Sequence, residues 1–168
     1  MPTPLREFQV ELAGRLATTD QVGPELRMLR ERYGFTQEGL ATLLGLRRES
    51  LSRIETGAVA LTLPVLQRIT RIVTLSKAVR EHLASVESRG GRVDDAFLSM
   101  LAVALRLDKA TADEVILASM MSYEQKRREA LRSLSGHDGR ETREGRMVKS
   151  TPALGRDYIA PRSGQFLE

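Results

Sequence analysis

The chain has 168 residues, a formal net charge of +4 and no cysteine. This length fits one domain, or a small domain with appendages, and the lack of cysteine excludes disulfides, thiolate metal sites and a cysteine nucleophile. The N-terminal segment has no apolar core of the signal-peptide type, and no apolar run approaches the roughly 18 residues that span a membrane. We therefore expect a cytoplasmic protein without a membrane partner, whose positive charge permits contact with a polyanion.

The first predicted element is an amphipathic helix over residues 5–17. Its apolar positions recur at helical spacing: Leu5, Phe8, Leu12 and Leu16. Pro24 suits the first turn of a second helix, which Gly34 ends. We assign residues 1–23 as an N-terminal helix and linker.

Two short helices and a longer one follow. Thr36 is a suitable N-cap for a helix over residues 37–44. Gly45 can adopt the positive φ of a tight turn, and the next helix is predicted over about residues 47–56. A further helix is predicted over about residues 63–75. The scarcity of β-branched runs favours an all-α fold for the whole chain.

The helix over residues 47–56 has one face free of apolar residues. That face carries Arg48, Glu49, Ser52 and Arg53. An arginine can donate two hydrogen bonds to O6 and N7 of guanine, and a glutamate can accept one from N4 of cytosine. Backbone N–H groups at Thr36 and Gln37 suit a DNA phosphate. The alternative is that the arginines are ordinary solvated surface and that Glu49 holds Arg53 at i+4.

An ordered set of residues runs without gaps through this region. It comprises Leu26-Arg27, Leu29-Arg30, Phe35-Thr36-Gln37-Glu38, Leu40-Ala41, Gly45-Leu46, Ser50-Leu51-Ser52-Arg53-Ile54-Glu55 and Gly57. With this spacing, the segment resembles the Cro/C1-type helix-turn-helix of phage repressors, often called the XRE family. The resemblance implies a helix-turn-helix DNA-binding domain at residues 24–75.

The resemblance also implies roles for single residues. Gln37 is similar to the family glutamine that touches a DNA phosphate and steadies a recognition side chain. Three residues fall where the family reads base edges: Arg48, Glu49 and Arg53. Arg30 and Glu55 match a pair that forms a salt bridge between the first and third helices of the motif, so we expect a structural role for them.

The chain departs from the family pattern at several positions. Gly39 stands where a glutamate is usual, so the capping box from Thr36 is broken. Arg47 stands where Ser or Thr is commoner, which removes a cap and adds a positive charge near the DNA phosphates. Residues 25–60 hold about as many acidic as basic side chains. Because tight binding by one copy is then doubtful, we expect a homodimer on a near-palindromic DNA site.

The rest of the chain is predicted as a helical extension and a tail. Residues 76–135 form the extension, which is a possible dimerisation region and ends in a helix over about residues 111–134. A faint repeat of about 32 residues aligns 48–55 with 80–87, either as a second, degenerate helix-turn-helix or as chance similarity between amphipathic helices. Residues 136–168 are predicted to form a flexible tail, because they are rich in Gly, Arg, Ser, Thr and Pro.

Three functions remain open from the sequence. The first is a transcriptional repressor or dual regulator acting on double-stranded DNA. The second is an antitoxin whose tail binds a toxin, and the third is an interaction protein that contacts RNA polymerase or another regulator through the extension or tail. The two histidines lack metal-ligand spacing and there is no phosphate-binding glycine loop, so we expect no enzymatic activity, cofactor or metal.

Overall fold

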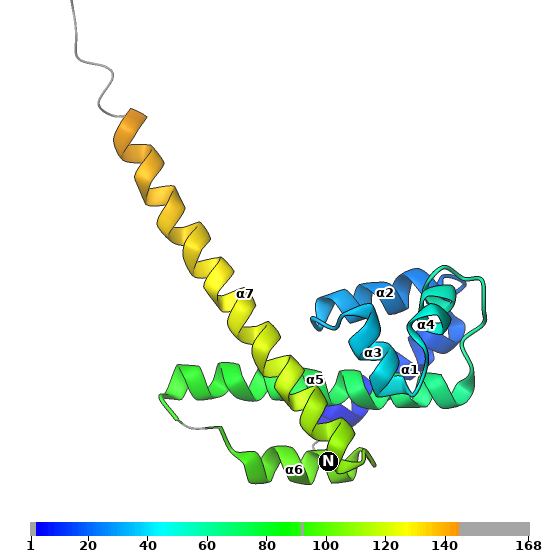
Figure 1. The fold of residues 1–168 in the computed structure, drawn as a ribbon. Coiled ribbons are helices and arrows are strands. Elements are labelled where there is room, and N and C mark those ends of the chain that lie inside the picture. Colours follow the sequence, from blue (N-terminus) through cyan, green and yellow to red (C-terminus); the bar gives the residue numbers. More distant parts are fainter. Residues whose placement is uncertain (1–2, 92, 145–168) are drawn as a thin grey trace, which may run out of the picture. The chain divides into compact units, whose positions relative to one another are not determined.

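The computed structural model of the chain describes residues 3–91 and 93–144, all of whose regular structure is helical (Figure 1). The helices are α1 (Thr3–Thr18), α2 (Val22–Arg32), α3 (Gln37–Leu44), α4 (Arg48–Glu55), α5 (Leu63–Arg89), α6 (Asp95–Ala104) and α7 (Lys109–Glu144). The predicted all-α fold is confirmed. The chain divides into two compact units, Met1–Arg128 and Glu129–Glu168, and the contacts described below lie within the first. None of the helices described is both long enough and apolar enough to cross a membrane.

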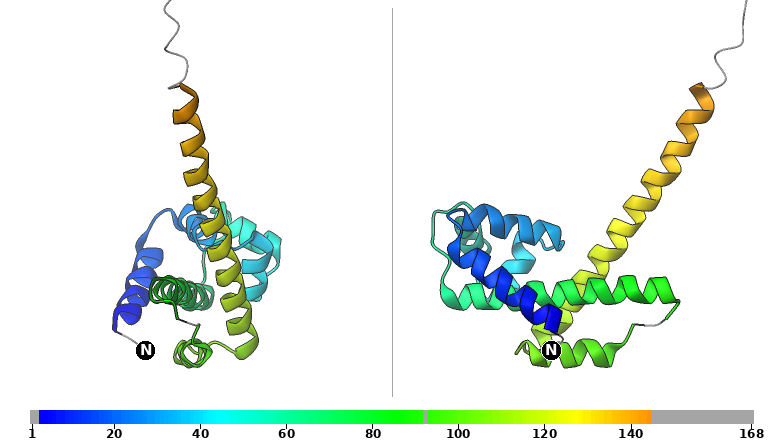
Figure 2. Two further views of the ribbon diagram at one scale, coloured as in Figure 1. Left: turned by 90° about the vertical axis from the view of Figure 1, so that its left-hand side faces the viewer. Right: turned by 180° about the vertical axis from the view of Figure 1, so that it is seen from behind.

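Helix α5 is the helix against which α1, α3 and α6 pack. Its apolar residues recur at helical spacing and include the fully buried Ile69, Leu75 and Val79. Helix α1 lies along α5 and buries the leucines predicted for its inner face, Leu12 and Leu16 among them (Figures 1 and 2). Helices α3 and α6 also pack on α5. The core therefore joins the segment with the predicted helix-turn-helix to the helices before and after it.

The two short helices begin and end close to their predicted bounds. Thr36 caps α3, because its Oγ1 accepts a hydrogen bond of 2.9 Å from the backbone N–H of Gly39. Half of the capping box therefore forms although the glutamate is missing. Gly45 ends α3 in the left-handed conformation, with φ at 68°. Arg47 is the N-cap residue of α4 and its side chain makes no capping hydrogen bond.

The helix predicted over residues 63–75 is longer than expected. It continues without interruption to Arg89, since no glycine or proline follows Pro64 until Gly90. Residues 80–87, which the faint repeat aligns with the recognition helix, lie inside α5 with no turn before them. The interpretation of this segment as a second helix-turn-helix is therefore wrong.

The last helix is also longer than predicted. It runs from Lys109 to Glu144, past the expected end near Leu134 and into the segment predicted as a tail. The glycines in this stretch do not end it, because a single glycine costs a helix only about 1 kcal/mol relative to alanine. The remaining residues of the predicted tail, 145–168, lie outside the described residues.

Candidate nucleic-acid interface

Helices α3 and α4 form a helix-turn-helix around a small apolar core. That core contains Leu40, Ala41, Leu44, Leu51 and Ile54, all of them buried. Ala41 is 1% exposed, as expected of a small residue where two helices approach closely. The backbone N–H of Leu46 donates to the carbonyl of Ala41 over 2.8 Å and closes the turn between the helices. Because these side chains are buried, the opposite face of α4 is exposed to solvent.

A buried charged network joins α4 to the two helices before it. Arg30 of α2 donates from Nε to Oε1 of Glu55 over 2.7 Å and from Nη2 to Oε2 over 3.2 Å. The Arg30 and Glu55 side chains are only 12% and 3% exposed. A third hydrogen bond of 3.1 Å joins Nη1 of Arg30 to the carbonyl of Phe35. The structure thus brings together the pair that the resemblance implies, with the two-pronged geometry that makes such bonds strong.

Gln37 connects the start of α3 to the same network. Its Nε2 donates to Oε2 of Glu55 over 2.9 Å. This hydrogen bond fixes the Gln37 side chain, which the resemblance places at a DNA phosphate, against α4. The backbone N–H groups of Gln37 and Glu38 have no helical acceptor, because they lie in the first turn of α3. This helix N-terminus is a suitable donor to a phosphate oxygen.

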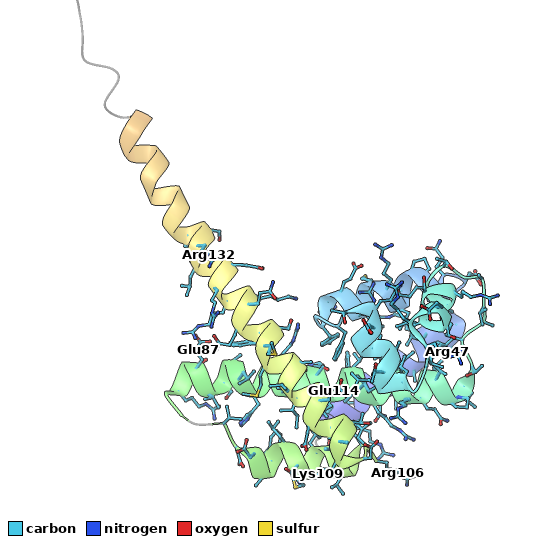
Figure 3. All side chains as sticks on the ribbon, viewed as in Figure 1. Arg47, Glu87, Arg106, Lys109, Glu114 and Arg132 are labelled. Carbon is cyan, nitrogen blue, oxygen red and sulfur yellow. The ribbon has the colours of Figure 1, made fainter. Side chains whose placement is uncertain are left out.

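The outer face of α4 carries most of the residues predicted to read DNA. Arg47, Arg48, Glu49 and Arg53 are exposed, and Ser52 is half-buried (Figure 3 labels Arg47). Glu49 lies 3.8 Å from Nε of Arg48, with both side chains more than 60% exposed, and it makes no ion pair with Arg53. The side chains of Arg47 and Arg53 have no hydrogen-bond or ion-pair partner among the described residues. Two of the three arginines are therefore unpaired.

Two contacts that position the helices had no local signal in the sequence. A Cβ on Gly23 would lie 2.5 Å from the carbonyl oxygen of Glu55, so this glycine lets α2 cross the end of α4. Arg80 of α5 donates to the carbonyl of Arg32 over 2.8 Å and to Oγ of Ser122 over 2.7 Å. Burial lowers the pKa of the Arg80 guanidinium, which also lies 5.2 Å from the centre of the Tyr33 ring. Helices α5 and α7 thus hold the end of α2.

Comparison with known proteins agrees with this geometry. Residues 21–83 match a family model described as "Helix-turn-helix domain". The matched segment contains α2, α3, α4 and most of α5, so it extends beyond the predicted domain end at residue 75. No significant match was found among the curated proteins or among the solved structures. Residues 21–83 thus form a helix-turn-helix domain, consistent with the XRE type, and this domain class indicates a DNA-binding regulator.

Proposed function

We propose that the protein is a sequence-specific transcriptional regulator of the Cro/C1 type that places α4 in the major groove of double-stranded DNA. The outer face of α4 carries the proposal. It presents Arg48 and Arg53 to solvent, while the opposite face is anchored by Leu51, Ile54 and the buried Glu55. Because the buried face holds the helix in place, the backbone positions from which the exposed side chains extend are fixed. Such preorganisation favours base reading over loose contact.

The residues around α4 suit distinct parts of a DNA duplex. Arg48 and Arg53 have the fork geometry that reads guanine, and Glu49 can accept from a cytosine amine. Arg47 and the N-terminus of α3, with Thr36 and Gln37, would contact phosphates. The phosphate contacts would set the register, whereas the α4 side chains would read the sequence. The proposal includes no enzymatic activity, cofactor or metal.

We further propose that the protein acts as a homodimeric repressor. Four apolar side chains on α6 and α7 are between 60% and 75% exposed: Met100, Val103, Leu117 and Met121. Such surface supports a protein interface, and a two-fold dimer would set two α4 helices roughly 34 Å apart on a near-palindrome. A dimer that occupies such an operator in the cytoplasm would exclude other proteins from it, which is why we propose repression.

The same apolar surface favours one alternative. A protein that binds RNA polymerase or another regulator through α6 and α7 would expose these side chains as well, since methionine adapts to varied partners. The antitoxin alternative depends on the apolar ends of the tail, which lie outside the described residues. Retention on RNA polymerase without DNA would favour the interaction protein. Co-purification of a small toxin would favour the antitoxin.

The proposal is tested by selecting binding sites from random duplex DNA with the full-length protein. We expect enrichment of one near-palindromic site. The Arg48→Ala/Arg53→Ala variant should fail to enrich it, because each lost guanine contact costs about 1–3 kcal/mol. An Arg6→Ala/Arg89→Ala variant is the matched control, since it removes the same charge from exposed positions on α1 and α5. If the first variant enriches the same site as the wild type, α4 does not read bases.

A further inference from the structure

A positively charged cavity lies outside the helix-turn-helix surface described above. Its volume is about 360 Å³, and it lies between Leu44 at the end of α3, one face of α5, and the turn that joins α6 to α7. Its charged lining residues are Arg68, Arg71, Arg106 and Asp108. Three guanidinium groups and one carboxylate give the lining a formal charge of +2.

Two of these charged residues are already engaged in holding the fold. Arg68 donates from Nε to the carbonyl of Leu43 over 2.7 Å and from Nη2 to Oγ1 of Thr111 over 3.1 Å. Asp108 accepts from the backbone N–H and the hydroxyl of Thr111, at 2.9 and 2.8 Å. These hydrogen bonds from Thr111 lower the pKa of Asp108. The carboxylate also lies 3.7 Å from Nη2 of Arg68, and it makes no ion pair with Arg71 or Arg106.

The other two arginines are unpaired. The guanidinium groups of Arg71 and Arg106 have no ion-pair or hydrogen-bond partner among the described residues. Arg71 lies three residues after Arg68 on α5. Arg106 belongs to the turn before α7 (Figure 3). Two like charges are therefore held at one cavity without a protein counter-charge of their own.

The backbone of Arg106 provides an independent observation. Its φ of 54° makes it the one non-glycine with a positive φ among the described residues. Its N–H donates to the carbonyl of Val103, and the N–H of Leu107 donates to the carbonyl of Ala102. This is the position after a helix end where glycine or asparagine is favoured. An arginine here is unfavourable for the backbone, and its guanidinium makes no hydrogen bond or ion pair with the described residues that would offset this cost.

We propose that this cavity binds a phosphate group, with Arg71 and Arg106 as its binding residues. A guanidinium matches the oxygens of a phosphate with two parallel hydrogen bonds. The volume is at the lower end of the range for ligand sites, which suits a phosphate or diphosphate group. Because Arg68 joins α3 to the start of α7, the ligand would sit where the helix-turn-helix meets the helical extension.

The test is titration of the full-length protein with inorganic pyrophosphate at constant ionic strength, followed by calorimetry. We expect the wild type to bind. Arg71→Gln and Arg106→Asn should each weaken binding about tenfold or more, the usual effect of losing one charge-assisted hydrogen bond. Arg6→Gln, which removes an exposed charge from α1, should leave binding unchanged. Arg106→Asn should also unfold at the same or a higher denaturant concentration than the wild type, because asparagine tolerates positive φ.

A second titration, with a duplex of random sequence, identifies the source of the phosphate. If the two variants lose pyrophosphate but bind the duplex as the wild type does, the ligand is a free anion. The phosphate comes from the DNA backbone if two results are found together. The duplex displaces pyrophosphate, and each variant reduces the slope of log K for duplex binding against log salt concentration by about one. The proposal is overturned if the wild type does not bind pyrophosphate and the variants bind the duplex normally, or if the variants bind pyrophosphate as tightly as the wild type.

Discussion

Replacing Glu55 by alanine is expected to lower the free energy of unfolding by about 3–5 kcal/mol, the usual cost of breaking a buried ion pair from one side. The carboxylate accepts hydrogen bonds from both Arg30 and Gln37, and its side chain is 3% exposed. The variant would leave the Arg30 charge largely buried without a counter-charge. Urea denaturation followed by circular dichroism measures this loss, because the fold is helical throughout its described part.

Glu81→Ala is the control for the Glu55 variant. Glu81 is exposed and pairs with Lys77 one helical turn away on α5, apart from the buried network. Ion pairs on the surface contribute little, so the urea midpoint should hardly change. The structural role of the buried network is refuted if the two alanine variants unfold at the same urea concentration.

Gly34→Ala is expected to cost about 2–5 kcal/mol through two separate effects. Gly34 has a φ of 77°, where an L-residue costs roughly 1–2 kcal/mol. A Cβ there would also lie 2.0 Å from Oγ and 2.5 Å from Cβ of Ser122 on α7. Relieving that overlap typically costs a further 1–3 kcal/mol or so. Thermal or urea unfolding of the variant measures the sum.

Gly57→Ala separates the two effects on Gly34. Gly57 has nearly the same φ, 76°, but a Cβ there would meet nothing within 4 Å. This control should therefore lose only the conformational part. A Gly34→Ala/Ser122→Gly double variant, compared with Ser122→Gly alone, should also lose only the conformational part, because both variants lack the Arg80–Ser122 hydrogen bond and carry a glycine inside α7. Equal losses for Gly34→Ala and Gly57→Ala would mean that α7 does not press against the end of α2.

The helix-turn-helix was predictable because its signals are local. Thr36 as an N-cap, Gly45 in the turn and the apolar spacing of Leu51 and Ile54 each act within one or two helical turns. The resemblance added the Arg30–Glu55 pair, whose members are 25 residues apart and which no local pattern predicts. For this region the sequence determined both the fold and the face of α4 that stays exposed.

The helical extension was less predictable because its contacts are distant in sequence. Arg80 reaches Ser122 and Arg68 reaches Thr111 across more than 40 residues, and arginines on helices are usually solvated. The apparent repeat led to a wrong prediction of a second helix-turn-helix, because α5 has no glycine or proline where the repeat required a turn. The left-handed conformation of Arg106 carried no signal, since glycine or asparagine marks that position elsewhere.

The central claim, that α4 reads base sequence, is tested most directly by a specificity ratio. The affinity for a selected duplex is compared with that for a scrambled duplex of equal length and composition, at one salt concentration. The account predicts that the wild type prefers the selected duplex by about 10³-fold or more. Arg48→Ala/Arg53→Ala should lose most of this preference and keep most of its affinity for the scrambled duplex. A variant that binds both duplexes more weakly by the same factor, with its preference intact, would contradict the claim.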